Sequence, residues 1–243
     1  MPEKRIAMWS GPRNISTALM YSFDNRGDCY TSDEPLYANF LLSTGIPHPG
    51  AQEVIQNHET DLDTVISELT GPIPDGKPIW YQKHMCHHIS DESDLSWIDG
   101  LTNCFLIRDP REVLLSLSKI TGVLDLRVIG LTQQIRILDH VCSKSGEFPP
   151  IIDSRDVLDN PRSVLSSLCD SVGVPFSEDM LSWEPGPRDC DGIWAKNWYS
   201  SVWRSSGFFP HTPREGDLSA ALSVVLEEAT PIYEELRSRR IKP

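Results

Sequence analysis

The first part of the chain already restricts the fold, because a short apolar strand runs into a turn and then into a helix. Residues 5–9 predict the strand, Ser10-Gly-Pro-Arg-Asn14 predicts the turn, and residues 16–23 predict a helix with one apolar face. A strand, a glycine-containing turn and a helix in this order are typical of α/β proteins that bind an anion where the helix starts. A fold of this class needs further strand and helix units of this kind along the chain.

Strand and helix patterns alternate along the whole chain. Strands are predicted over residues 5–9, 29–31, 79–82, 104–107 and 150–153, and helices over residues 16–23, 51–69, 110–120, 131–142, 160–172 and 217–237, with a kink or break at Pro231. This alternation predicts an α/β fold, a three-layer sandwich in which helices cover both faces of a parallel central sheet. Because no linker, repeat or low-complexity tract interrupts the pattern, we expect one domain over residues 1–243.

Residues 183–214 follow neither pattern and are rich in Gly, Pro, Trp and Arg. Long irregular segments in compact domains often form lids or binding loops, so we expect a lid or an acceptor-binding loop here. A surface excursion with no role is the alternative.

Composition and charge exclude several classes of partner. The 35 acidic and 22 basic residues among 243 give a net charge of −13, which argues against a nucleic-acid partner. No apolar run reaches the ~18 residues that span a bilayer, so no membrane partner is expected. The first apolar stretch breaks at Gly11-Pro12, too early for a signal peptide, and the six cysteines form no C-x-x-C pair. We therefore expect a cytoplasmic protein with reduced thiols.

The turn after the first strand predicts a phosphate site. Backbone N–H groups at a helix start attract anions, and Arg13 adds a charge and parallel hydrogen bonds. The alternative, that Ser16 merely caps the helix, explains neither Arg13 nor Thr17. The turn is not a Walker A loop, because Ile15 stands where that motif has lysine. The residues predicted to bind the anion are Gly11, Arg13, Asn14, Ile15, Ser16 and Thr17.

A second anion site is predicted at the end of the strand 104–107. Arg108 follows this strand, and Ser116 lies eight positions further along the predicted helix. Ligands of open α/β sheets bind at the carboxyl ends of the strands, so this pair could hold a second phosphate. A local Arg108–Asp109 salt bridge and an exposed serine are the alternative.

Together these segments resemble the sulfotransferase family that uses 3′-phosphoadenosine-5′-phosphosulfate (PAPS). Pro12-Arg-Asn-Ile-Ser-Thr17 is similar to the family's P-K-S-G-T-T motif for the 5′-phosphosulfate, and Arg108 and Ser116 have the spacing of its 3′-phosphate motif. Gly186-Pro-Arg188, followed by Gly192-Ile-Trp-Ala-Lys-Asn-Trp198, more loosely resembles the segment that closes over the cofactor, which would make Arg188 a cofactor residue. The resemblance implies a P-loop NTPase-like sulfotransferase fold and transfer of sulfuryl from PAPS to a small-molecule acceptor, without a metal.

The resemblance also implies where the catalytic groups lie. Arg13 replaces the family's lysine and, since it stays charged, would stabilise the transferring group electrostatically. The base is expected either at Glu34 or in the segment after the third strand, at His84, His87 or His88, with Lys83 beside them. A metal site is the alternative for the histidines, and a plain turn residue is the alternative for Glu34. Residues expected to line the acceptor pocket are Tyr37, Trp194, Lys196 and Trp198.

Two other functions remain open at this stage. One is a P-loop-type small-molecule kinase, against which the missing Gly-Lys pair argues. The other is a non-catalytic nucleotide-binding protein. Because the surface is acidic, a small neutral or zwitterionic acceptor fits better than a polyanion.

Overall fold

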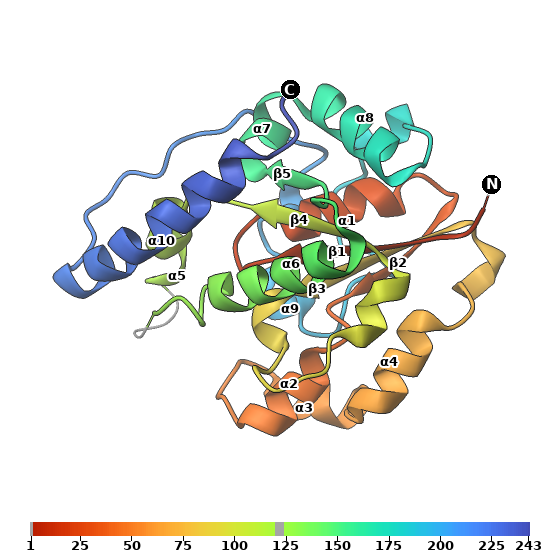
Figure 1. Cartoon of the computed structure of the whole chain (residues 1–243), viewed down its shortest axis with the longest axis horizontal. Helices are drawn as coiled ribbons and strands as arrows, with labels where there is room; N and C mark the ends of the chain where they lie inside the picture. The colour runs from red at the N-terminus through yellow and green to blue at the C-terminus, as the bar shows by residue number, and fades with distance from the viewer. Residues whose placement is uncertain (1, 120–123) are drawn as a thin grey trace.

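The computed structural model describes residues 2–119 and 124–243. Its centre is a five-stranded parallel sheet in the order β2-β3-β1-β4-β5 (Figure 1). The strands are β1 (Lys4–Ser10), β2 (Cys29–Asp33), β3 (Ile79–Met85), β4 (Thr102–Ile107) and β5 (Ile151–Asp153). The predicted parallel sheet is therefore confirmed, and each predicted strand coincides with an observed one to within a few residues.

The register of the three central strands brings their carboxyl ends together. Ser10, at the end of β1, pairs with Met85 of β3 and with Leu106 of β4. The turn that follows β1 therefore starts at the middle of the sheet's carboxyl edge, between the segments that follow β3 and β4. Ligands of parallel sheets bind at this edge.

Alternating side chains along the strands bury both faces of the sheet. Ile6 and Met8 of β1 pack on one face with α1 (Ser16–Asp24) and α8 (Pro161–Val172). Ala7 and Trp9 pack on the opposite face. The helices on that face are α4 (Leu62–Thr70), α5 (Pro110–Leu117), α6 (Leu131–Ser145) and α10 (Ala220–Ser238). The three-layer α/β arrangement is thus confirmed (Figure 1).

Some helix boundaries differ from the predicted ones. The predicted helix 51–69 is wrong as a single element, because α3 (Ala51–Asn57) and α4 are separate. Asp61 starts α4 by accepting a hydrogen bond from the Thr64 N–H at 2.9 Å, which gives the chain a new helix start. The expected break at Pro231 does not occur, since α10 continues through this exposed position. The predicted end of the helix 110–120, Ile120, lies outside the described residues.

The remaining elements are short. They are α2 (Tyr37–Thr44), α7 (Ser154–Asp159), α9 (Ala195–Trp198) and the 3₁₀ turns η1 (Pro74–Gly76), η2 (Cys86–His88), η3 (Ser96–Gly100), η4 (Glu178–Leu181) and η5 (Val202–Arg204). α9 packs with α2 and α3 in a small apolar cluster of its own. In the described ranges 2–119 and 124–243, none of the helices combines the length and the apolar character needed to cross a membrane.

Candidate functional site

A cavity of about 380 Å³ lies at the carboxyl edge of the sheet. One end is formed by residues 12–18, the turn after β1 and the start of α1. The other end is formed by Glu34, Lys83, His87 and His88, which follow or end the neighbouring strands. The cavity therefore joins the predicted phosphate turn to the predicted base residues in one space.

The turn between β1 and α1 has an unusual backbone. Arg13 and Ile15 both have a left-handed conformation, with φ of 65° and 61°. Such strain, of order 1–3 kcal/mol per residue, is concentrated at functional sites. Within the described part of the chain no side chain caps α1, and Ser16 is its first helical residue rather than its cap. The N–H groups at the start of α1 are thus left to a ligand, and an anion fits them.

Arginines from distant parts of the sequence meet at this turn. Arg13 Nε donates to Ser116 Oγ at 2.9 Å, and Arg108 Nη1 donates to the Arg13 carbonyl oxygen at 2.7 Å. Arg214, which the sequence did not single out, also lines the cavity. Burial lowers the pKa of Arg13, and the positive charges of Arg214 and Arg108 lower it further. This end of the cavity therefore holds the charge that an anionic ligand would neutralise.

Arg108 is held by a carboxylate as well as by the turn. Its Nε and Nη2 atoms donate to Glu112 Oε2 at 3.0 and 2.6 Å, and His211 Nε2 lies 2.5 Å from the other Glu112 oxygen. The local partner considered above, Asp109, instead caps α5 by accepting from the Arg111 N–H. An anion that binds Arg108 would therefore compete with Glu112 for the guanidinium.

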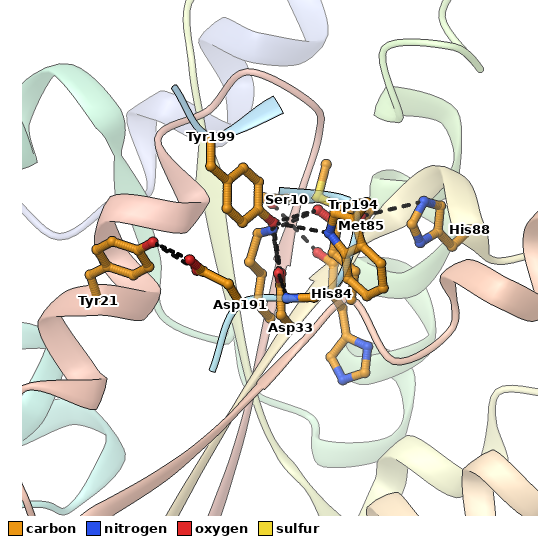
Figure 2. A network of polar contacts seen from close by, with 12 residues as sticks. Ser10, Tyr21, Asp33, His84, Met85, His88, Asp191, Trp194 and Tyr199 are labelled. Atoms are coloured by element: carbon orange, nitrogen blue, oxygen red, sulfur yellow. Dashed lines mark hydrogen bonds and ion pairs between the residues drawn. The ribbon is translucent and has the colours of Figure 1, made fainter. Parts of the chain in front are cut away.

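The opposite end of the cavity is built around a buried lysine. Lys83 Nζ donates to Asp33 Oδ1 at 2.7 Å, to Glu34 Oε1 at 2.6 Å and to the Tyr199 hydroxyl oxygen at 2.6 Å. The side chains of Lys83 and Asp33 are 1% and 2% exposed, so water does not screen these charges. Figure 2 shows Tyr199 and Asp33 in contact at the centre of this network. One cation is thus shared by two carboxylates.

Burial and charge set the protonation of these groups. Burial lowers the pKa of Lys83, but the charges of Asp33 and Glu34 outweigh it and raise this pKa above its usual range. Burial raises the pKa of Glu34, with Lys83 opposing the shift and Asp33 adding to it. Burial together with nearby positive charge lowers the pKa of His87 to about 3 and that of His88 well below its usual value. These shifts favour the neutral form of both histidines, whereas the raised pKa of Glu34 increases its affinity for a proton.

His88 is fixed beside Glu34 by aromatic packing. Its ring stacks on Tyr37 and on Phe40, with ring centroids 5.0 and 4.7 Å apart. His88 Nε2 lies 3.9 Å from Glu34 Oε2. Tyr37 also lines the cavity, as does Trp198. These residues give the Glu34 end of the cavity an aromatic wall.

Four residues that the sequence nominated do not line this cavity. His84 is buried against Trp9, with ring centroids 4.4 Å apart, because neighbouring residues of β3 point to opposite faces of the sheet. Arg188 is bound to Asp24 at 2.8 Å and to Asn25, at the C-terminal end of α1. In this structure the contacts of His84 are thus packing contacts and those of Arg188 are ion-pair and hydrogen-bond contacts away from the cavity.

The other two belong to the expected acceptor pocket. Trp194 is buried and lines a separate cavity of about 830 Å³ that runs along β2. Lys196 is exposed and forms an ion pair with Glu53 at 2.6 Å. Trp198 of α9 and the following Tyr199 line the cavity at Glu34, whereas Trp194 and Lys196 do not.

Two further candidates lie beside the cavity rather than on its wall. Ser116 reaches it through Arg13, as described. Gly11 is needed for close packing, because a Cβ atom at this position would lie 2.4 Å from the Ile129 carbonyl oxygen. Asn14, which lines the cavity, donates from Nδ2 to the Leu106 carbonyl and ties the turn to β4.

Several lining residues were missed by the sequence analysis. They are Tyr199, Arg214, Phe208 and Phe209. All come from the irregular segment expected as a lid or from the residues around it, where no periodicity indicates which side chains point inwards. For the three histidines of residues 84–88 a metal was considered, but among residues 2–119 and 124–243 no group of three or more His, Cys, Asp or Glu side chains is placed to hold one.

Comparison with known proteins points to one family. Residues 4–240 match a family profile described as a sulfotransferase domain. Two curated proteins of Arabidopsis thaliana, named branched-chain-amino-acid aminotransferase-like protein 2 and protein 1, are 36% and 35% identical over 96% of this chain. The chain spans only 41% of the length of each.

Solved structures share the fold at low sequence identity. A sulfotransferase domain from the curacin biosynthetic pathway has a TM-score of 0.53 at 14% identity, and the match covers 100% of this chain and 99% of that one. A sulfotransferase domain from the Synechococcus PCC 7002 olefin synthase has a TM-score of 0.51 at 18% identity, with 94% and 95% covered. At these identities the likeness concerns the fold alone.

Proposed function

This chain belongs to the sulfotransferase domain family, and from this premise we propose that it transfers a sulfuryl group from PAPS to a small-molecule acceptor and releases 3′-phosphoadenosine-5′-phosphate (PAP). The observation that carries the proposal is the single cavity in which a cationic helix start faces a buried carboxylate. The turn lacks the Gly-Lys pair of a kinase phosphate loop, and a protein that only binds a nucleotide leaves the carboxylate end of the cavity without a role.

The donor would bind at the arginine end. Arg13, Ser16, Thr17 and the N–H groups at the start of α1 would hold the 5′-phosphosulfate, because they offer hydrogen-bond donors and positive charge together. Arg108 and Ser116, which already contact the turn, would hold the 3′-phosphate. The exposed Arg214 would add a further positive charge beside Arg13.

In the reaction, the sulfur–oxygen bond to the 5′-phosphate breaks while a bond forms between sulfur and the acceptor oxygen or nitrogen. The acceptor loses a proton, and we assign Glu34 to take it. Its pKa is raised by burial, which brings it closer to the pH of the reaction, whereas His87 with a pKa lowered to about 3 is a poor proton acceptor. Arg13 would stabilise the negative charge that develops on the departing PAP.

The acceptor would be neutral or zwitterionic. At the Glu34 end two carboxylates share one cation, which disfavours an anionic acceptor. Aromatic side chains line the cavity and suit a ligand with an apolar body; they are Tyr37, Trp198, Phe208 and Phe209.

Binding of the donor product tests the proposal first. PAP without Mg²⁺ is expected to raise the free energy of unfolding by ~2.7 kcal/mol at a hundredfold excess over Kd, as for any ligand that binds only the folded state. The measurement is a thermal shift with PAP and with ATP, each with and without Mg²⁺. Stabilisation only by ATP with Mg²⁺ would instead support the small-molecule kinase.

Replacing Arg108 tests the site of the 3′-phosphate. Arg108→Ala is expected to weaken PAP binding by roughly 10-fold or more, the effect of losing a charged hydrogen-bond donor. Binding of AMP, which lacks the 3′-phosphate, should change far less. Calorimetry with both nucleotides makes the measurement, and Arg162→Ala, which removes an exposed arginine that pairs with Glu178 on the surface, is the control. Normal PAP binding in an inactive Arg108→Ala protein would contradict the assignment.

A further inference from the structure

The buried Lys83 cluster is completed by the irregular segment 183–214. The Tyr199 hydroxyl donates to Asp33, with its oxygen 2.8 Å from Oδ2, and accepts from Lys83 Nζ at 2.6 Å. The Gly192 N–H donates to the same Asp33 oxygen at 3.0 Å. Asp33 therefore receives two hydrogen bonds from this segment and one from Lys83.

These contacts decide how the lysine is shared. Lys83 lies between Asp33 and Glu34 and carries one positive charge for two carboxylates. Hydrogen bonds that Asp33 accepts from other donors compensate part of its negative charge. The interaction of Asp33 with Lys83 is then weaker, and the interaction of Lys83 with Glu34 is stronger. The Tyr199 hydroxyl keeps its proton for this purpose, because burial and the charges of Asp33 and Glu34 raise its pKa well above the usual value.

We propose that Tyr199 is a positioning residue, which acts through Asp33 to hold Lys83 on Glu34 and so sets the basicity of Glu34. This inference rests on the proposed function in its account of Glu34 as the base. The Tyr199 hydroxyl lies 3.4 Å from Glu34 Oε1 and closer to Lys83 and Asp33, so its main contacts are with those two residues.

Packing holds Tyr199 in place. It follows α9, its N–H bonds to the Ala195 carbonyl at 2.8 Å, and its ring belongs to the cluster formed with α2 and α3. Trp194 Nε1 lies 3.3 Å from its hydroxyl oxygen. Docking of the segment on α2 and α3 thereby brings the hydroxyl to the cluster, which gives this otherwise irregular segment a role in catalysis.

The groups that face Glu34 come from four elements and from the residue after α9. They are Asp33 from β2, Lys83 from β3, His88 from η2, Tyr37 from α2 and Tyr199. His88 and the two tyrosines are neutral around pH 7, so within this group Asp33 and Lys83 bring the charge, and the Tyr199 hydroxyl adds a hydrogen bond that lowers the pKa of Glu34.

Tyr199→Phe tests the inference by removing one hydroxyl. Asp33 should then draw Lys83 away from Glu34, and the pKa of Glu34 should rise by about one unit, a shift of the size that a nearby charge produces. The direct readout is the titration of the Glu34 carboxyl carbon by NMR, with the signal assigned from Glu34→Gln. The acidic limb of kcat against pH should move in the same direction, while KM for PAPS changes less than about twofold.

Tyr21→Phe is the matched control. The Tyr21 hydroxyl donates to Asp191 at 2.7 Å, so this variant also removes a tyrosine–aspartate contact from the same segment, but at a site outside the cavity (Figure 2). Its Glu34 titration should match that of the wild type. Equal shifts in the two variants would mean that the hydroxyl matters only for docking of the segment, and would overturn the inference.

Asp33→Asn provides a second test with the opposite sign. Without the charge of Asp33, Lys83 forms its ion pair with Glu34 alone, so the pKa of Glu34 should fall. Adding Tyr199→Phe to this variant should shift the pKa of Glu34 by much less than Tyr199→Phe does alone, because the shorter contacts of the Tyr199 hydroxyl are with Asp33 and Lys83 and only a long contact of 3.4 Å reaches Glu34. An equal further shift, or an unchanged Glu34 titration in Tyr199→Phe, refutes the inference. The NMR titration needs no turnover, so failure of sulfuryl transfer in the wild type would count against the proposed function alone.

Discussion

Replacing Glu34 with glutamine is expected to lower kcat for sulfuryl transfer by ~10²–10⁴-fold, the range for loss of a general base. Glutamine has the same shape, and its carbonyl oxygen can still accept the hydrogen bond from Lys83 Nζ that Glu34 Oε1 accepts at 2.6 Å. It cannot take a proton from the acceptor. The change therefore removes proton transfer while the cavity keeps its form.

The Glu34→Gln substitution should also change the pH dependence of kcat. The base works when it is deprotonated, so kcat of the wild type should rise with pH through the pKa of Glu34, and activity should be lost as pH falls below it. Burial raises that pKa, so the loss should begin at a higher pH than for an exposed glutamate. In Glu34→Gln the residual activity should lack this acidic limb.

Two controls make the result specific. Glu53→Gln makes the same change in an exposed glutamate that pairs with Lys196, and it should leave kcat at the wild-type value. PAP should stabilise Glu34→Gln as it does the wild type, which shows that the donor end is intact. If Glu34→Gln keeps more than about a tenth of the wild-type kcat, Glu34 is not the base, and His87→Gln becomes the next variant to measure.

The parallel sheet could be predicted from the sequence because its strands are short, apolar and separated by clear helical patterns. The turn after β1 was predicted from local chemistry, and the resemblance paired it with Arg108 and Ser116. The contact from Arg13 to Ser116 could not be predicted, because it depends on how α5 packs beside β1. The two segments lie at the same end of one cavity.

Two other wrong predictions could have been avoided, because the sequence holds a pattern that argues against each of them. Lys83 and His84 are neighbours on a strand, so they point to opposite faces and cannot both line one cavity. Likewise Asp61, three positions before Thr64, is a helix-cap pattern that separates α3 from α4.

No sequence pattern indicated the role of Tyr199. It follows one helical turn in an irregular segment, and its role depends on Asp33 and Lys83, which are distant in sequence. Periodicity indicates which side of an element is buried, but it does not indicate what a loop side chain meets after docking. The same reason explains why Arg214 and the two phenylalanines of residues 208–209 were missed.

The largest expected effect on stability belongs to Lys83. Lys83→Met should lower the free energy of unfolding by ~3–5 kcal/mol, as found when one partner of a buried ion pair is removed. Methionine fills similar space, but Asp33 and Glu34 remain without their cation, and Asp33 is only 2% exposed. Urea unfolding followed by circular dichroism makes the measurement. The loss should shrink as pH falls, because burial raises the pKa of Glu34, and its protonation removes the unpaired negative charge that destabilises the folded state at higher pH.

The matched control is Lys196→Met, which breaks a lysine–glutamate pair on the surface, where the Lys196 side chain is 55% exposed. It should cost ~0–1 kcal/mol, since water and salt screen such pairs. Adding Asp33→Asn to Lys83→Met removes one of the two stranded charges and should recover part of the stability. Equal losses in the two single lysine variants, or no recovery in the double variant, would mean that the cluster is stabilised by packing rather than by charge, and both the assignment of Glu34 and the role of Tyr199 would then need another basis.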